Sequence, residues 1–126
     1  MTVLLDTHVL LWFLRDDPLL SANAKAVIEN PQNRKLVSIT SCWEIAIKAS
    51  LGKLNADPRQ VLSALEPTGF LSLPILGQHC AHVLDLPPLH RDPFDRLLIA
   101  QATTEPMRFL TADASLRAYG SIVTVV

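Results

Sequence analysis

Four carboxylates are the residues of this sequence best suited to chemistry: Asp6, Glu44, Asp95 and Asp113. Each lies where an apolar run ends or where a helix is expected to begin. In an open α/β sheet these junctions gather at one edge, outside the carboxyl ends of the strands. Four acids brought together there would repel one another unless a cation lay between them, and Mg²⁺ or Mn²⁺ is the usual cation for oxygen ligands. Because the sequence has no nucleophile motif, a metal held by these acids predicts hydrolysis of a phosphodiester.

The elements that must position these acids alternate between strands and helices. Apolar or β-branched runs predict strands at 2–5, 35–40, 70–74, 108–111 and 121–126. Helical patterns lie between them, at 7–14, 21–30, 41–54, 57–69, 77–87, 92–105 and 113–120. This alternation predicts βαβ units with right-handed crossovers. We therefore expect an α/β fold with a mostly parallel central sheet, formed by a single domain that spans residues 1–126.

Helix capping is the alternative explanation for three of the acids. Asp6 and Asp113 could each cap the helix that follows. Ser41 and Glu44 fit a capping box, and Glu44 could also pair with Lys48 one turn further along the helix. Capping explains each acid singly, but it does not predict that every one of these strand–helix junctions should carry one. The shared position therefore favours a common site.

Asp92 and Asp95 can be separated by their places in the 92–105 helix. Asp92 precedes Pro93, and this pair is typical of a helix cap followed by proline in the first turn. Asp95 lies at the third helical position and shares a stripe with Leu98 and Ile99, so a carboxylate there would be buried. Metal ligation would account for it, and a second capping box is the alternative.

Composition and charge narrow the class of protein. The 126 residues are 49% hydrophobic and their mean hydropathy is +0.28, yet no apolar run approaches the roughly 18 residues of a membrane span. The N-terminus lacks the pattern of a signal peptide, and Cys42 and Cys80 have no paired spacing, so we expect a reduced cytoplasmic location and no membrane. A net charge of −1 means that nucleic acid is either not the substrate or is bound locally with the help of a metal.

Four histidines and a cysteine are weaker candidates. His79, Cys80 and His82 lie close together in a predicted helix. A zinc site needs three or four ligands, however, and no further candidate ligand is adjacent to this segment in the sequence. A solvated helix face is the expectation for this segment. His8 and His90 could touch a substrate, although a lone histidine is more often structural.

The cations and aromatic residues near the acids could each have a functional or a structural role. The cations that flank the acids are Arg15, Lys48, Arg91 and Arg96. They could contact phosphates or remain surface charges. Trp12 and Phe13 are expected in the core, and an exposed patch for a partner is the alternative.

Four stretches of the sequence carry a family resemblance: LLDTHVLLWFL, SITSCWEIAIKASLGKL, HRDPFDRLLIAQA and FLTAD. Together they span the chain, and it resembles the PIN-domain ribonucleases, in particular the VapC-like toxins of type II toxin–antitoxin systems. Carried over residue by residue, the acidic quartet of that family falls on Asp6, Glu44, Asp95 and Asp113. Asp92 matches a common feature of the subgroup.

The resemblance implies a PIN-like three-layer α/β/α fold and a Mg²⁺- or Mn²⁺-dependent endoribonuclease that hydrolyses RNA. Asp6, Asp95 and Asp113 would hold the metal, and Glu44 would complete the cluster directly or through water. The resemblance also implies a homodimer, alone or as a dimer of toxin–antitoxin pairs, and a small antitoxin that neutralises the toxin.

Other functions stay open on the sequence alone. A haloacid-dehalogenase-type phosphatase needs a second Asp two residues after its nucleophile, where this chain has His8. A receiver domain needs an acidic pair before its first strand, and MTVLLD has none. A non-catalytic binding module with the PIN fold, or a PIN nuclease that processes RNA and is not a toxin, remain as alternatives. The complete set of four acids argues against the binding module.

Overall fold

A five-stranded parallel sheet forms the centre of the computed structural model, which describes all of residues 1–126. The strands are β1 (Thr2–Leu5), β2 (Arg34–Ser38), β3 (Leu71–Leu73), β4 (Arg108–Thr111) and β5 (Val123–Val125). Their order across the sheet is β3-β2-β1-β4-β5, and every neighbouring pair is parallel. The predicted α/β class is confirmed, and the sheet is wholly rather than mostly parallel.

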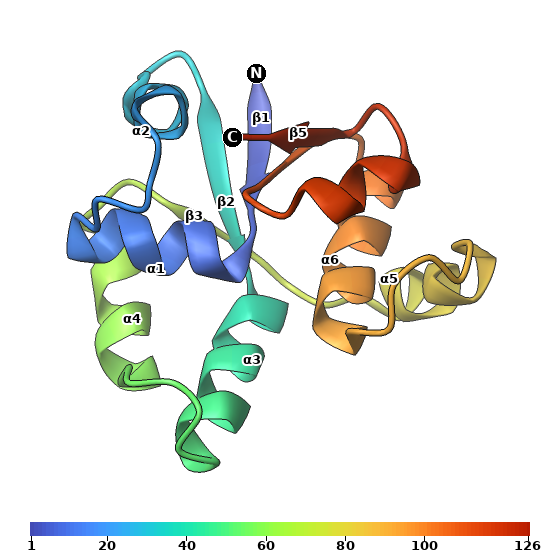
Figure 1. The fold of residues 1–126 in the computed structure, drawn as a ribbon, viewed down its shortest axis with the longest axis horizontal. Helices are drawn as coiled ribbons and strands as arrows, with labels where there is room; N and C mark the ends of the chain where they lie inside the picture. The colour runs from blue at the N-terminus through green and yellow to red at the C-terminus, as the bar shows by residue number, and fades with distance from the viewer.

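Helices cover both faces of this sheet, as Figure 1 shows. The α-helices are α1 (Thr7–Arg15), α2 (Ala22–Glu29), α3 (Ile39–Ser50), α4 (Pro58–Leu65), α5 (Gly77–His82) and α6 (Pro93–Thr104). Two 3₁₀-helices follow α5 and β4: η1 (Val83–Asp85) and η2 (Ala114–Tyr119). None of the helices has the length and apolar character that crossing a membrane requires.

Alternate side chains of β1 pack against the two layers of helices on opposite faces of the sheet. Val3 and Leu5 belong to one core cluster with residues of α1 to α4, whereas Leu4 belongs to a second cluster with residues of α6 and η2. All three side chains are fully buried. A strand that is buried on both faces is expected to be apolar throughout, which is why β1 reads as an uninterrupted hydrophobic run. These two cores confirm the three-layer α/β/α arrangement.

The strand order places a crevice beside β1. The chain passes from β1 to β2 and β3 on one side, and then crosses to β4 and β5 on the other. Ligands of open α/β sheets bind where this reversal occurs, outside the carboxyl ends of the strands. The backbone N–H of Asp6 donates to the carbonyl of Leu110 at 2.9 Å and so joins the two strands at that end.

One difference from the predicted elements lies between β2 and α3. The strand was expected to run through residue 40, but α3 already begins at Ile39. The hydroxyl of Ser38 accepts from the N–H of Thr40 at 2.9 Å, so Ser38 is the helix cap. The predicted capping box of Ser41 and Glu44 is therefore wrong.

Further corrections concern the ends of two predicted helices and the geometry of a third. The predicted helix at 41–54 ends as α3 at Ser50, just before Gly52, whose φ of 70° lies in the left-handed region. The predicted helix at 77–87 is α-helical only to His82 and then tightens into η1. The segment at 113–120 forms the 3₁₀-helix η2 rather than an α-helix. The 3₁₀-helix η1 has three residues, a usual length for that geometry, whereas η2 is longer than usual with six.

Candidate functional site at the carboxyl edge of the sheet

Asp6 lies directly at the end of β1 and is 5% exposed. Its Oδ1 accepts from the N–H of Thr7 at 2.7 Å, and its Oδ2 accepts from the hydroxyl of Thr111 at 2.6 Å. Burial raises the pKa of Asp6, although the bond from Thr111 acts in the opposite direction. Asp6 caps α1, as the alternative explanation predicted, and the same carboxylate is held at the end of β4.

Glu44 is held against the start of α1 by Thr7. The hydroxyl of Thr7 donates to Oε1 of Glu44 at 2.6 Å, and Lys48 forms an ion pair with Oε2. This confirms the predicted pair of Glu44 and Lys48. Partial burial disfavours the charged ammonium, but the bond and charge of Glu44 outweigh burial, and the pKa of Lys48 is raised. Glu44 is 2% exposed, so both of its oxygens are engaged inside the protein.

Asp95 lies in the first turn of α6, with a side chain 15% exposed. Its Oδ2 is 2.9 Å from Nε2 of His90, whereas Asp92 is the cap and accepts from the N–H groups of Phe94 and Asp95. Burial, and then the charges of Asp6 and Asp92, raise the pKa of Asp95 to about 7. The alternative of a second capping box is therefore not realised, because the carboxylate turns towards His90.

Asp113 follows β4 and caps η2. Its Oδ1 accepts from both the hydroxyl and the N–H of Ser115, and the side-chain bond lowers the pKa of Asp113. The N–H of Asp113 in turn donates to the hydroxyl of Thr111 at 3.0 Å. Thr111 therefore links Asp113 to Asp6, and the two acids line one hollow.

The structure brings the four predicted acids to one edge of the sheet, but it does so in two groups. One ligand atom each of His90, Asp95 and Asp113 lies within 4.8 Å of the others. Asp6 and Glu44 lie outside this triad, close enough for their charges to raise the pKa of Asp95. Sequence reasoning named His90 only as a residue that could touch substrate. Its signal is its place two residues before Asp92, the cap of α6.

The donor set of this cluster fits a hard divalent cation. Its carboxylate oxygens suit Mg²⁺ or Mn²⁺, whereas an imidazole by itself suits zinc, iron, nickel or copper, so the carboxylates are the ligands that favour a hard ion. Burial is the main cause that raises the pKa values of Asp6 and Asp95, and neighbouring acids add to it, so the ionised forms of both carboxyls are disfavoured. A bound divalent ion would supply compensating positive charge.

Two of the cations that flank the acids, Arg96 and Arg15, bond to other parts of the protein. The guanidinium of Arg96 donates to the carbonyls of Val83 and Pro87 and to the hydroxyl of Tyr119. It therefore holds the segment before α6 rather than facing a phosphate. Arg15 donates to the carbonyl of Asn55 at the far end of α1.

The predicted solvated face of α5 is wrong for His79, which is fully buried. Its Nδ1 accepts from the N–H of Leu76 at 2.9 Å, and its Nε2 pairs with Glu105. His82 lies instead 3.7 Å from Asp85. The three metal-binding side chains that lie close enough to share an ion are His90, Asp95 and Asp113, and none of them belongs to α5.

Gln101 is a buried polar residue that the sequence analysis did not single out. Its Oε1 accepts from the hydroxyls of Ser38 and Thr40, and its Nε2 donates to the carbonyl of Pro74 at 3.2 Å. The signal was a lone amide within the apolar stretch of α6. Gln101 fixes the start of α3, the helix that carries Glu44.

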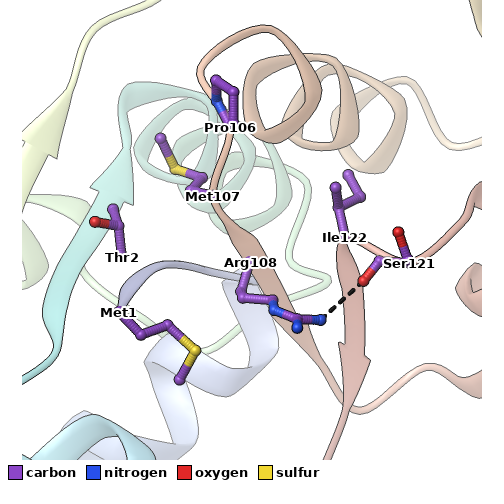
Figure 2. Close-up of a pocket in the computed structure, with 7 residues that line it drawn as sticks. All are labelled: Met1, Thr2, Pro106, Met107, Arg108, Ser121 and Ile122. Atoms are coloured by element: carbon purple, nitrogen blue, oxygen red, sulfur yellow. Dashed lines mark hydrogen bonds between the residues drawn. The ribbon is translucent and has the colours of Figure 1, made fainter.

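A separate cavity of about 390 Å³ lies at the opposite edge of the sheet (Figure 2). Its lining residues are Met1, Thr2, Pro106, Met107, Arg108, Ser121 and Ile122. The guanidinium of Arg108 donates to the carbonyl of Ser121 at 2.9 Å. This cavity adjoins the amino ends of β1 and β4 and contains no acid, so it is not the site of the predicted chemistry.

Comparison with known proteins agrees with this geometry. Residues 3–121 match the family model of the PIN domain. The chain belongs to the PIN domain family. No curated protein matches this PIN domain by sequence. Among solved structures, it is similar to the crystal structure of VapBC2 from Rickettsia felis bound to a DNA fragment from their promoter. The TM-score is 0.69 at 15% identity, and the match covers 100% of this chain and 98% of that chain. At this identity, the likeness supports the PIN fold.

Proposed function

We propose that this PIN domain is a Mg²⁺- or Mn²⁺-dependent endoribonuclease and that it acts as the toxin of a toxin–antitoxin pair. The observation that carries the proposal is the meeting of Asp95 and Asp113 beside Asp6 at the reversal of strand order, with the pKa of Asp95 raised to about 7. Membership of the PIN family supports nuclease chemistry, and the sequence resemblance to VapC-like toxins supports RNA as the substrate.

In this proposal the acidic side chains bind the metal ion, and two threonines orient those side chains through hydrogen bonds. Asp6, Asp95 and Asp113 would bind the metal together with His90, and Glu44 would complete the cluster directly or through water. When bound, the divalent ion makes water more acidic and neutralises charge on the phosphate. Thr111 orients Asp6 through a bond of 2.6 Å, and Thr7 does the same for Glu44.

Two nucleophilic side chains of α3, Ser41 and Cys42, are not activated for a covalent route. Cys42 is buried, and burial raises the pKa of its thiol, which disfavours the thiolate. Ser41 is fully buried and bonded to Thr7. Water is therefore the proposed nucleophile, attacking in line with the 3′ oxygen as leaving group. The expected products carry 5′-phosphate and 3′-hydroxyl ends.

The first test is cleavage of total cellular RNA by the purified protein, with Mg²⁺ or Mn²⁺ and with EDTA. Discrete fragments that need the metal, and that disappear with Asp6→Asn, would support the ribonuclease. Asp16→Asn is the matched control, because Asp16 is an exposed aspartate with a φ of 51° that Asn also adopts readily. Full activity of Asp6→Asn would refute the assignment of Asp6 to the metal.

The partner proposals have separate tests. Growth arrest on induction, relieved by a small protein encoded beside this one, would support the toxin; cleavage without growth arrest would favour a PIN nuclease that processes RNA. Binding of Mn²⁺ by a folded protein that cleaves no RNA would favour the non-catalytic module. The proposed homodimer predicts twice the monomer mass in solution.

A further inference from the structure

A hollow of about 250 Å³ opens directly beside the acids, lined by Asp6, His8, Trp12, Ala112 and Asp113. His8 and Trp12 lie one turn apart on α1, with ring centroids 6.1 Å apart and planes tilted by 35°. Two aromatic rings therefore line the hollow on the side of α1, and two carboxylates of the proposed metal site adjoin it. Ala112, with its small side chain, leaves this space open.

Core packing does not explain why Trp12 is present. Its neighbours Phe13 and Leu14 pack against the core cluster between the sheet and α1, as predicted for Phe13. Trp12 belongs to neither core cluster and is only half-buried, and His8 beside it is exposed. The prediction of a core role for Trp12 is therefore wrong. An indole that lines a hollow, next to an exposed imidazole, is available to a ligand.

The size and lining of the hollow narrow the class of ligand. Its volume of about 250 Å³ is below the range of roughly 300–1,000 Å³ that is typical for drug-sized ligands, so it suits a small group, and the rings of His8 and Trp12 favour a flat one. Proteins hold the unpaired bases of single-stranded nucleic acid by stacking them on aromatic side chains. Asp6 and Asp113 line the hollow, and Asp113 also belongs to the triad with His90 and Asp95, so a base in the hollow would lie next to a phosphate at the proposed metal site.

We propose that this hollow binds one nucleobase of single-stranded RNA, adjacent to the phosphate that is cleaved, and that the base stacks on Trp12. The proposal rests on the ribonuclease function proposed above. Stacking accepts any base but is stronger for larger rings, so purines are favoured at this position. Double-stranded RNA, whose bases are already stacked on each other, would not fill the hollow.

Trp43 provides an internal control. It is 53% exposed on α3 and contacts Phe94 edge to face with a centroid distance of 5.0 Å, and it does not line the hollow. The chain contains only these two tryptophans. Trp43→Phe therefore leaves Trp12 as the only indole fluorophore, and Trp12→Phe leaves Trp43.

Binding is measured by tryptophan fluorescence in EDTA, with hexaadenylate and with an abasic hexamer of the same length as probes. The expected result is quenching in the Trp43→Phe protein by hexaadenylate and not by the abasic hexamer, which has the phosphates but no bases. The Trp12→Phe protein should show little quenching. Equal quenching by both probes, or quenching of Trp43 alone, would overturn the base site.

Cleavage of single-stranded RNA with Mn²⁺ gives the second readout. Trp12→Ala should lower kcat/KM by about tenfold, mainly through KM, and Trp12→Phe should restore most of it. Unchanged KM in a folded Trp12→Ala protein would also overturn the base site. If no RNA is cleaved but Trp12 is quenched by hexaadenylate alone, the base site stands and the nuclease proposal fails. If cleavage requires Asp6 but ignores Trp12, the nuclease stands and the base site fails.

Discussion

Replacement of Asp95 by Asn should stabilise the metal-free protein at alkaline pH. Asn retains an oxygen that can accept from His90, but it removes a charge that lies close to Asp6 and Asp92. The pKa of Asp95 in the folded protein is about 7, against 3.8 for a free aspartate. Unlike a salt-bridged carboxylate, Asp95 therefore opposes folding when it is ionised.

The sign and size of the change in stability follow from the difference between the pKa of Asp95 in the folded protein and that of a free aspartate. Between about pH 4 and pH 7 the folded protein holds a proton that the unfolded chain has lost, so stability falls as pH rises. A shift of about three units corresponds to a ceiling of about 4 kcal/mol. Because the side chain retains contact with solvent and with His90, screening reduces the expected gain to about 2 kcal/mol at pH 8.

Urea unfolding in EDTA at pH 4 and pH 8 measures this gain. Wild type and Asp95→Asn should differ little at pH 4, where the folded Asp95 is protonated. At pH 8 the variant should be the more stable. Mn²⁺ should then raise the stability of wild type by mass action and leave the variant almost unchanged. Asp16→Asn serves as the control at both pH values.

A variant that is less stable than wild type at pH 8 in EDTA would refute the reasoning, because it would show that Asp95 is stabilised in its ionised form. Equal stabilisation of both proteins by Mn²⁺ would show instead that Asp95 is not a ligand. The two results bear on different steps: the first on the electrostatics of the empty cluster, and the second on metal binding.

Three further predictions test other parts of the site. Mn²⁺ affinity, measured by calorimetry, should rise with pH up to about 7 and then level off, because Asp95 must lose its proton to bind the ion. Gln101→Leu leaves the hydroxyls of Ser38 and Thr40 without their buried acceptor, so it should lower the free energy of unfolding by about 2 kcal/mol. Urea unfolding measures this loss, and Gln78→Leu, at an exposed glutamine, should have no effect. Arg96→Met removes the bonds to Val83 and Pro87 and should weaken Mn²⁺ binding by loosening the segment that carries His90; unchanged affinity would contradict this role.

Local sequence patterns determined most of the elements. Strands that are buried on both faces are mostly apolar, so β1, with Val3, Leu4 and Leu5 in a row, could be recognised without knowledge of its neighbours. Helix caps are equally local: Ser21 begins α2, and Asp92 with Pro93 begins α6, as predicted. The meeting of the acids at one edge also followed from the sequence, because the carboxyl ends of parallel strands all point the same way.

Tertiary contacts decided what local patterns left open. Ser38 and Ser41 could each have capped α3. Ser38 does so, and its hydroxyl donates a hydrogen bond to Gln101, 63 residues away. His79 is buried because it packs between α5 and α6 and meets Glu105, 26 residues away.

The chemistry of the site was also a tertiary result. That Asp95 is an acid was plain from the sequence, but its pKa of about 7 depends on burial and on Asp6, which lies at the other end of the chain. The hollow beside Trp12 exists only because α1 and the end of β4 lie together. Residue types and local order are encoded in short stretches of sequence, whereas burial, charge–charge distance and cavity shape depend on packing between segments that are far apart in it.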